Sequence, residues 1–265
     1  MNQSFENRVA WVVGASSGIG AEIALQFNAA GGIVVLSARN EAKLKAVQSR
    51  LKFPEKSMIL SLDLEDQTKF SEKTKTVIDA FGKIDFLYNN GGLSQRGEAA
   101  STALEIDRRI MEINYFGNIG LTKAVLPYMQ KQKSGHIIVI SSIAGKFGFY
   151  LRSAYAASKH ALQGFYESVL LEEAKNNIFV TMAYPGKINT EISKSALNDQ
   201  GEAHGKMDHN QETGMSVAVC VKKLLKAVTK RKKSILIGNK EIWAVHIKRF
   251  SPALFWRIIR KQSPT

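Results

Sequence analysis

The sequence predicts an α/β protein built on one doubly wound, mostly parallel sheet with helices on both faces. Short β-branched runs alternate with helical patterns along the chain. These runs are almost continuously apolar, as expected for strands whose two faces are both covered by helices. The 265 residues contain no interior linker or low-complexity tract and are enough for one sizeable core. We therefore expect a single domain over residues 1–265 with right-handed crossovers.

Each element follows from its local pattern. Strands are predicted over residues 8–14, 33–37, 57–62, 84–88, 136–140, 178–183 and 234–237. Helices are predicted over residues 19–30, 41–51, 69–80, 103–130, 153–176 and 217–229, with an amphipathic pattern over 242–260. The irregular segment 187–214 is rich in Asn, Asp, Gln, His and Gly. It follows the sixth strand at the carboxyl edge of the sheet, where ligands bind in such folds, so we expect a substrate lid.

The net charge of +14 is concentrated at the carboxyl end. Residues 222–265 hold 13 Lys and Arg and one acid, Glu241, whereas the first 221 residues hold 24 basic and 22 acidic side chains. The single cysteine, Cys220, excludes an internal disulfide and suits a reducing compartment. The first seven residues do not resemble a signal peptide, and no apolar run approaches the roughly 18 residues of a spanning helix. We expect a cytoplasmic protein.

The carboxyl-terminal segment 240–265 combines basic side chains with Trp243, Phe250, Phe255 and Trp256 in an amphipathic pattern. Three interpretations are open. The segment packs on the core or a neighbouring subunit and covers the cleft, or it contacts an anionic membrane surface peripherally. Nucleic acid is the least favoured, because no recognition module accompanies the charge, and we expect no nucleic-acid partner.

Tyr155 and Lys159 lie one helical turn apart, so their side chains share a helix face. A neighbouring ammonium favours the phenolate, and we expect Lys159 to lower the pKa of Tyr155 from its ordinary value of about 10. Such a phenol gives or takes a proton near neutral pH, as carbonyl reduction or alcohol oxidation requires. The spacing alone is common by chance on exposed helices.

A glycine-rich turn, Gly14-Ala-Ser-Ser-Gly18-Ile-Gly20, joins the first predicted strand to the first helix. Glycines there permit a tight turn and let backbone N–H groups approach a pyrophosphate at the helix N-terminus. The spacing is G-x-x-x-G-x-G, and tight βα turns use glycine for other reasons too. Its place after the first apolar strand favours a nucleotide site.

In combination, these motifs resemble the short-chain dehydrogenase/reductase family over roughly residues 7–240. The glycine turn matches the family's cofactor turn, and Asn89-Asn-Gly-Gly92 matches its Asn-Asn-Ala-Gly segment. The family's catalytic set is matched by Asn114, Ser142, Tyr155 and Lys159. Its nicotinamide-side loop is matched by Pro185, Gly186 and Thr190. Val13 replaces the usual Thr and Gly91 the usual Ala, which we expect to alter cofactor affinity at most. The segment from Ser153 to His160 and the basic aromatic end further resemble the "member 7" group of reductases, which is associated with membranes and with lipid or steroid-like carbonyls.

The resemblance implies a Rossmann domain of about seven strands that binds a nicotinamide dinucleotide. The expected cofactor contacts are Gly14, Ser16, Ser17, Gly18, Ile19, Gly20, Arg39, Asp63, Leu64, Asn90, Gly91, Gly92, Tyr155, Lys159, Pro185, Gly186, Ile188 and Thr190. The second strand ends without an acid for the ribose 2′-OH, and Arg39 could pair with a 2′-phosphate. We therefore expect NADP(H) rather than NAD(H), although Arg39 could be merely solvated and Asp63 merely a helix cap.

The resemblance also implies roles for the catalytic set. Tyr155 would exchange a proton with the substrate oxygen, Ser142 would hydrogen-bond the same oxygen, and Lys159 would also bind the nicotinamide ribose. Asn114 would hold a water that links Lys159 to solvent. An apolar pocket is expected from Phe147, Phe149, Tyr150, Tyr184 and Met207, all of which could equally be core.

The expected function is therefore reversible interconversion of a carbonyl and an alcohol on an apolar, lipid-like substrate, without a metal. A catalytically silent nucleotide sensor and a peripheral membrane scaffold are the alternatives. Family members commonly assemble through the helices that correspond to residues 103–130 and 153–176, so we expect a homo-dimer or homo-tetramer.

Overall fold

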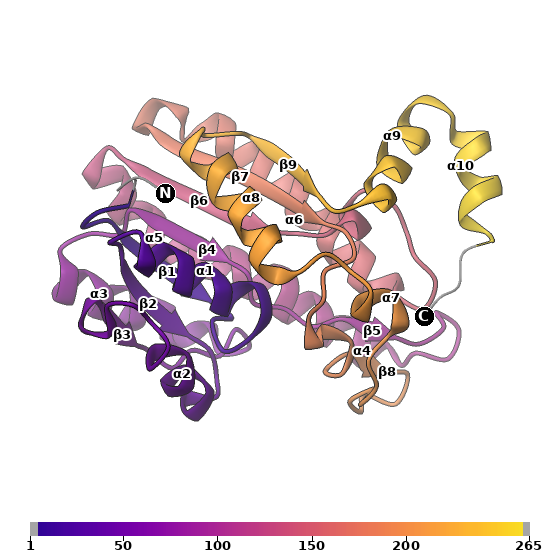
Figure 1. Cartoon of the computed structure of the whole chain (residues 1–265), viewed down its shortest axis with the longest axis horizontal. Helices are drawn as coiled ribbons and strands as arrows, with labels where there is room; N and C mark the ends of the chain where they lie inside the picture. Colours follow the sequence, from indigo (N-terminus) through magenta and orange to yellow (C-terminus); the bar gives the residue numbers. More distant parts are fainter. Residues whose placement is uncertain (1–4, 262–265) are drawn as a thin grey trace.

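A computed structural model describes residues 5–261, and Figure 1 shows its central sheet between two layers of helices. Within the described residues, the sheet has seven strands in the order β3-β2-β1-β4-β6-β7-β9, and each neighbouring pair runs parallel. Its strands are β1 (Val9–Val13), β2 (Ile33–Ser37), β3 (Ser57–Ile59), β4 (Phe86–Asn89), β6 (Gly135–Ile140), β7 (Ile178–Pro185) and β9 (Ser234–Ile237). The predicted fold class is confirmed.

The described helices are α1 (Gly18–Ala29), α2 (Glu41–Gln48), α3 (Phe70–Phe81), α4 (Leu104–Met111), α5 (Asn118–Gln132), α6 (Ser153–Glu172), α7 (His209–Glu212), α8 (Val217–Thr229), α9 (Trp243–Phe250) and α10 (Pro252–Ile259). Five of them, α1, α2, α3, α6 and α8, lie close to predicted positions, whereas the others differ from the prediction as described below. None of these helices is both long enough and apolar enough to cross a bilayer.

The core has two halves because successive strand residues point to opposite faces of the sheet. In β1, Ala10 and Val12 join the cluster that includes α1 and α8, and Trp11 joins the cluster that includes α3, α5 and α6. All of β1 is buried, which explains why the sequence shows a continuous apolar run there. Strand order reverses between β1 and β4, and in such sheets ligands bind at the carboxyl ends beside that point.

The helix predicted over residues 103–130 is not continuous. A π-helical segment, Glu112–Gly117, separates α4 from α5. A π turn inserts one extra residue into the helix and is frequent at functional sites. Here it contains Asn114, one of the predicted catalytic residues.

The amphipathic segment predicted over 242–260 is broken as well. It forms two helices, α9 and α10, because Pro252 occupies the first turn of α10 and lacks the N–H that would continue α9. The two helices pack against one another beyond the end of β9 (yellow in Figure 1). Residues 262–265 of the predicted segment lie outside the described part of the chain.

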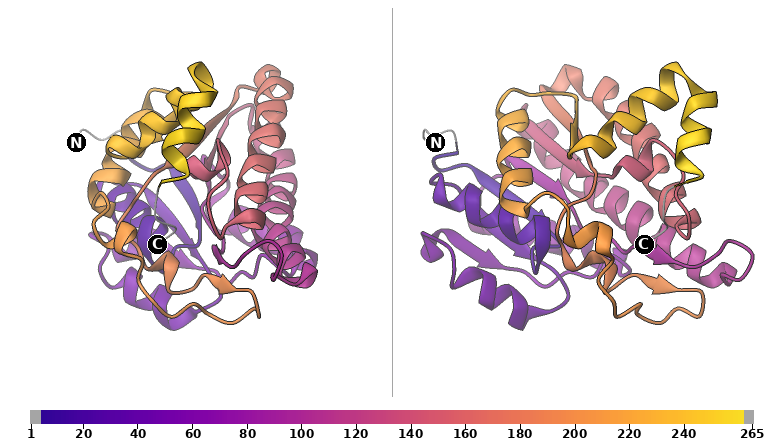
Figure 2. Two further views of the ribbon diagram at one scale, coloured as in Figure 1. Left: turned by 90° about the vertical axis from the view of Figure 1, so that its right-hand side faces the viewer. Right: turned by 45° about the vertical axis from the view of Figure 1, so that its right-hand side comes forward.

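The predicted lid, residues 187–214, is an ordered segment with elements of its own. It contains α7 and the strand β8 (Leu197–Asn198), which pairs with β5 (Gln95–Arg96) in a two-stranded sheet that the sequence pattern does not predict. Leu197 packs on Ile106, Ile110 and Ala154, so the segment is anchored by apolar contacts. Figure 2 shows the lid (orange) and the α9–α10 pair (yellow) at the same end of the molecule.

Candidate active site

The glycine turn between β1 and α1 can be built only with glycine at key positions. Gly14 and Gly18 have positive φ angles of 73° and 54°. A Cβ on Gly14 would lie 2.9 Å from Nδ2 of Asn90, and one on Gly20 would collide with the carbonyl oxygen of Gly14. Nδ2 of Asn90 donates to that same oxygen at 3.2 Å, which braces a turn in which Val13 provides no hydroxyl.

This turn fits a pyrophosphate. The N-cap residue of α1, Ser17, makes no side-chain capping hydrogen bond, so the first N–H groups of α1 are not taken by its hydroxyl. A helix N-terminus of this kind attracts anions through those groups and through the helix dipole. Ser16, Ser17, Gly18 and Ile19 all line the large cleft described below.

A smaller hollow of about 90 Å³ adjoins the turn. The predicted contacts Asp63, Leu64 and Gly91 line it together with Arg39. A Cβ on Gly91 would come within 2.6 Å of Cδ1 of Leu64, so glycine in place of the family's usual alanine allows Leu64 to pack closely against the backbone. Oδ1 of Asp63 accepts a hydrogen bond from the Glu65 N–H at 3.0 Å, so this side chain also orders the start of its turn.

Arg39 lines both hollows and lies two residues after the end of β2. Its side chain is 57% exposed, and Nη1 is 3.9 Å from the carboxylate of Glu65, which also pairs with Arg109. Lys43, in the first turn of α2, lines the same cleft. Asn40 caps α2, because its Oδ1 accepts from the Lys43 N–H at 3.0 Å.

Three of the four predicted catalytic residues meet in a cleft of about 1310 Å³ that also contains the glycine turn. Ser142 follows β6 and caps a short 3₁₀ helix by accepting from the Ala144 N–H at 3.1 Å. Tyr155 lies in the first turn of α6, and Ser142 is one of the groups that act on its phenol. Lys159 lies one turn further along α6, and its Nζ donates to the Ile140 carbonyl at 3.0 Å.

The expected effect of Lys159 on Tyr155 is wrong. Burial raises the pKa of Tyr155 above its ordinary value, and the groups that oppose this effect are Ser142, Arg152 and Arg96. Nζ of Lys159 is 5.8 Å from the centre of the Tyr155 ring and faces the end of β6 instead. Burial also lowers the pKa of Lys159 to about 8. The phenol is therefore a neutral proton donor at pH 7.

Asn114 is completely buried in the π-helical segment. Its Oδ1 accepts from the Leu93 N–H at 2.7 Å, and its Nδ2 donates to the Leu93 carbonyl at 2.9 Å and to the Ser158 hydroxyl at 3.0 Å. The side chain thus fixes the segment after β4 rather than projecting into open space. A Cβ on Gly92 would lie 2.9 Å from Oδ1 of Asn114 and 3.6 Å from Nζ of Lys159, so these groups converge at Gly92. The expected water relay stays a prediction.

The loop after β7 brings the remaining predicted contacts into the cleft, which Pro185, Gly186, Ile188 and Thr190 all line. Glu241 holds this loop, because its Oε1 accepts from the Lys187 N–H at 2.9 Å and occupies the space that a Cβ on Gly186 would need. Sequence reasoning missed Glu241. Its signal was its place as the one acid in a strongly basic segment.

The far side of the cleft is apolar, as expected, but its composition differs. Phe147, Phe149 and Tyr150 line it. Tyr184 and Met207 are not among its lining residues: Tyr184 is buried beneath the Lys146 ammonium, and Met207 accepts a hydrogen bond from Ser193. Their places are taken by residues of the tail helices, namely Trp243, Ala244, Ile247, Ile258 and Ile259. The tail therefore packs on the core and covers part of the cleft.

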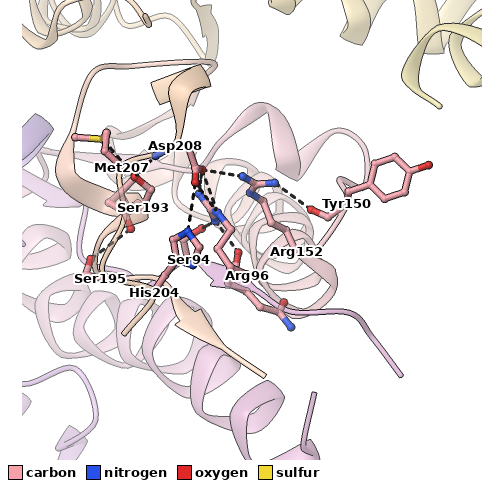
Figure 3. A network of polar contacts seen from close by, with 11 residues as sticks. Ser94, Arg96, Tyr150, Arg152, Ser193, Ser195, His204, Met207 and Asp208 are labelled. Atoms are coloured by element: carbon pink, nitrogen blue, oxygen red, sulfur yellow. Dashed lines mark hydrogen bonds and ion pairs between the residues drawn. The ribbon is translucent and has the colours of Figure 1, made fainter. Parts of the chain in front are cut away.

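Sequence reasoning also missed a charged cluster in the cleft wall, shown in Figure 3. Arg96 comes from β5, Arg152 directly precedes α6, and Asp208 belongs to the lid. Both guanidinium groups donate to the Asp208 carboxylate. No short sequence pattern links the three residues, because 56 positions separate each neighbouring pair along the chain.

Comparisons with known proteins agree with this geometry. Residues 8–201 match the family model described as short chain dehydrogenase. A dehydrogenase/reductase SDR family protein 7-like from Anopheles gambiae is 41% identical, and the match covers 97% of this chain and 83% of that protein. Dehydrogenase/reductase SDR family member 7B from Mus musculus is 39% identical over 97% of this chain and 81% of its own length. The resemblance drawn from the motifs is confirmed.

Solved structures show the same fold. A short-chain dehydrogenase from Streptomyces avermitilis superposes with a TM-score of 0.82 at 27% identity, covering 97% of this chain and 98% of its own. A short chain dehydrogenase/reductase from Burkholderia phymatum, solved in complex with NAD, superposes with a TM-score of 0.83 at 20% identity over 99% of this chain and 98% of its own. The second likeness concerns the fold alone.

Proposed function

This chain belongs to the short-chain dehydrogenase/reductase family of oxidoreductases, and on that premise we propose that it interconverts a carbonyl and an alcohol with NADP(H). Family membership implies a nicotinamide dinucleotide as cofactor. The observation that carries the proposal is that one cleft contains both the glycine turn and the trio of Ser142, Tyr155 and Lys159. A bound nicotinamide supplies the hydride in reduction and accepts it in oxidation.

The residues of the chain handle the proton and hold the reactants. Tyr155 is protonated at neutral pH because burial raises its pKa, so it can give a proton to a carbonyl oxygen. The Ser142 hydroxyl lines the same cleft and can serve as a second donor to the carbonyl oxygen, in place of its long hydrogen bond of 3.5 Å to the Pro185 carbonyl. In oxidation Tyr155 accepts the proton, which favours high pH. Lys159, fixed by the Ile140 carbonyl beside the cleft, is the residue that would hold the ribose hydroxyls.

We propose an apolar, lipid-like substrate. Phe149 and Tyr150 line the cleft from one side, and Trp243 and Ile258 line it from the tail helices. A cleft of about 1310 Å³ exceeds the usual size of a small-molecule site, which leaves room for a long substrate beside the dinucleotide. The apolar lining favours hydrocarbon over sugar carbonyls.

The proposed preference for NADP(H) rests on Arg39. β2 ends in Ser37-Ala-Arg-Asn40 without an acid that would accept the ribose 2′-OH and repel a 2′-phosphate. Arg39 and Lys43 both line the cleft there, and an exposed guanidinium can pair with phosphate through two N–H groups. Glu65, at 3.9 Å from Arg39, is a competing partner that a 2′-phosphate would have to displace.

Replacement of Tyr155 by Phe tests the proposed chemistry. We expect Tyr155→Phe to lower carbonyl-dependent NADPH oxidation by at least about 100-fold, because general acid catalysis is lost. NADPH binding, titrated by cofactor fluorescence, should be unchanged. Tyr128→Phe, on α5 outside the cleft, is the matched control. Near-normal turnover by Tyr155→Phe would refute the assignment, and dinucleotide binding by the wild type without turnover of any carbonyl would favour the silent sensor.

Charge reversal at Arg39 tests the cofactor preference. Arg39→Glu should weaken NADPH binding by at least about tenfold and NADH binding far less, because a charged hydrogen bond to the 2′-phosphate is replaced by repulsion. Arg50→Glu, an exposed position outside the cleft, controls for the change in net charge. Equal losses for the two dinucleotides would remove the argument for NADP(H).

A further inference from the structure

The turn after β3 places three acids close to the end of β2. Asp63, Glu65 and Asp66 lie within four successive positions. Asp63 is committed to its own turn, since its Oδ1 accepts from the Glu65 N–H at 3.0 Å. Asp66 accepts a hydrogen bond from the Thr68 hydroxyl. Glu65 is the acid that reaches across, because its Oε2 lies 3.9 Å from Nη1 of Arg39. An anion that pairs with Arg39 therefore meets a carboxylate close by.

Arg109 engages this carboxylate from α4. Its Nε donates to Oε1 of Glu65 at 3.0 Å and its Nη2 donates to Oε2 at 3.3 Å, so the planar fork of the guanidinium contacts both oxygens. Arg39 approaches the same carboxylate only to 3.9 Å, which is beyond hydrogen-bonding distance. Glu65 is thus held by Arg109 rather than by Arg39.

The segment that carries Arg109 also touches the turn at a second point. Arg109 belongs to the last turn of α4, and the π-helical segment begins at Glu112. The Glu112 carboxylate accepts a hydrogen bond from the Gln67 side chain. The side chains of Arg109, Glu65 and Arg39 are 45%, 31% and 57% exposed, so water and salt screen their charges. The effect of Arg109 on any anion at Arg39 is therefore expected to be several-fold rather than several orders of magnitude.

We propose that Arg109 is a positioning residue that sets the choice between NADP(H) and NAD(H). By holding Glu65, it keeps Arg39 available for the 2′-phosphate of NADP(H). Without Arg109, Glu65 is left to pair with Arg39, and its charge repels a phosphate there. The inference rests on the proposed function and explains how a chain with three acids beside Arg39 accepts an additional phosphate.

Binding of two cofactor fragments tests this role without turnover. Adenosine 2′,5′-bisphosphate and adenosine 5′-monophosphate differ only in the 2′-phosphate, and calorimetry gives the preference for the bisphosphate as the ratio of their dissociation constants. Wild type is compared with Arg109→Gln, with the charge-conserving Arg109→Lys, with Glu65→Gln, and with the double variant of Arg109→Gln and Glu65→Gln. Arg108→Gln is the matched control, because it removes the same charge from the neighbouring exposed position of α4.

Arg109→Gln should lower the preference for the bisphosphate by about two- to fivefold, the factor that an exposed ion pair contributes. Arg109→Lys should retain part of the preference, since an ammonium meets Glu65 as a point charge rather than as a fork. In the Glu65→Gln background, Arg109→Gln should change the preference no more than Arg108→Gln does, because the carboxylate through which it acts is gone.

Two results would overturn the positioning role. The first is an unchanged preference in Arg109→Gln. The second is a loss of equal size with and without the Glu65 carboxylate, because it would show that Arg109 acts on the phosphate directly. A wild type that prefers the monophosphate would contradict the proposed choice of NADP(H) instead. The role of Arg109 is decided in that case too, because Arg109→Gln should lower the preference further from whatever value the wild type has.

A second, independent observation concerns Glu241, which joins the tail helices to the loop after β7. Its Oε1 accepts from the Lys187 N–H at 2.9 Å and from the Asn239 N–H at 3.1 Å. A Cβ on Gly186 or on Gly238 would collide with the same oxygen. One carboxylate oxygen is therefore seated between the chain segments that leave β7 and β9, in a space that glycine leaves open.

Both segments bear on the reacting end of the cleft. The Ser142 hydroxyl donates to the carbonyl of Pro185, the last residue of β7, at 3.5 Å. The helix α9 begins two residues after Glu241 and lines the cleft with Trp243 and Ile247. Glu241 is thus a link between the tail helices and the loop beside Ser142.

We infer that Glu241 is a positioning residue for the nicotinamide half of the cofactor, acting through the backbone of the loop after β7. This inference also rests on the proposed function. Its effect should be confined to one half of the dinucleotide, because Arg39 and the turn after β3 lie outside the segments that Glu241 holds.

The test compares the whole cofactor with its adenosine half. Glu241→Ala should weaken NADPH binding, titrated by fluorescence, by about tenfold, because a charged hydrogen bond to the loop is lost. The affinity for adenosine 2′,5′-bisphosphate should be unchanged. Glu241→Gln should bind NADPH almost as wild type does, since an amide oxygen accepts the same two bonds. Glu241→Asp, which keeps the charge but shortens the reach, should show the same selective loss as Glu241→Ala. Glu172→Ala, an exposed acid of α6 outside the cleft, is the control.

The outcomes separate this role from general stability. Unchanged NADPH affinity in Glu241→Ala and Glu241→Asp would overturn it. Equal losses for NADPH and the bisphosphate would overturn it as well, because they would indicate a general loss of structure. A wild type that binds neither ligand would contradict the proposed function, and both positioning roles with it.

Discussion

Replacing Lys159 by Met should make the protein more stable while removing a group that the proposed reaction uses. Lys159 is 4% exposed, and burial lowers the pKa of its ammonium from the ordinary 10.5 to about 8. That difference corresponds to a cost of about 3 kcal/mol for holding the charged form in the folded state. Met matches the length of the side chain and leaves only the Ile140 carbonyl without its hydrogen bond, which costs about 1 kcal/mol. The net gain at pH 7 is about 2 kcal/mol.

The sign of the pH dependence separates this cause from simple repacking. The folded-state pKa of Lys159 is depressed, so the cost is fully present below pH 8. As pH rises from about 8 towards 10.5, the folded state loses its proton before the unfolded state does, and the cost disappears. The advantage of Lys159→Met should therefore be greatest at pH 7 and shrink as pH rises through this window.

Urea unfolding of the cofactor-free protein between pH 7 and 10 measures this advantage. Lys123→Met, an exposed position in the middle of α5, is the control and should show no such trend. A gain of about 2 kcal/mol corresponds to roughly 5 °C in Tm for a chain of this size. A Lys159→Met protein that is less stable than wild type at pH 7, or a difference that stays constant with pH, would refute the reasoning.

Three further predictions follow from the site. Gly20→Ala should abolish dinucleotide binding, measured by fluorescence, because the added Cβ would collide with the Gly14 carbonyl. The circular dichroism spectrum should be unchanged. Dinucleotide binding of normal affinity would contradict the assignment of the Gly14–Gly20 turn as the dinucleotide site. Alcohol oxidation should keep rising between pH 7 and 10 while carbonyl reduction stays flat from pH 6 to 8, because burial raises the pKa of Tyr155; an oxidation rate that levels off below pH 7 would contradict this. Asn114→Ala should lower the free energy of unfolding, measured in urea, by about 2–3 kcal/mol, because the Leu93 N–H and carbonyl lose their partner. A decrease below about 0.5 kcal/mol would contradict this, because it would show that water replaces the amide.

Local pattern was sufficient to predict the parts of the site that lie within one βα unit. The turn from Gly14 to Gly20 and the pair Tyr155 and Lys159 could be read because their function depends on spacing within a single turn or helix. The break at Pro252 was also readable, since proline cannot continue a helix and commonly begins one. The apolar pattern alone does not show this break, because it continues across Pro252.

The contacts that depend on tertiary structure could not be read in this way. Arg96, Arg152 and Asp208 come from a loop strand, a helix start and a lid, and nothing in their immediate neighbours marks them as one cluster. The pairing of β5 with β8 involves two residues on each side, too few for a periodic signal. Glu241 acts through a backbone N–H more than fifty positions away.

The error about Tyr155 has the same origin and bears on how the phenol works. Spacing along α6 shows that an ammonium is near, but the pKa of a phenol depends equally on the water it loses on burial, and burial is a property of the whole fold. Here Lys159 is turned to the end of β6, and the charges that oppose the rise in pKa come from Arg96 and Arg152. Those two arginines therefore act on the phenol that the proposed reaction uses. Loss of Arg152 should raise the pH at which alcohol oxidation becomes fast, an effect that lid fastening alone would not produce.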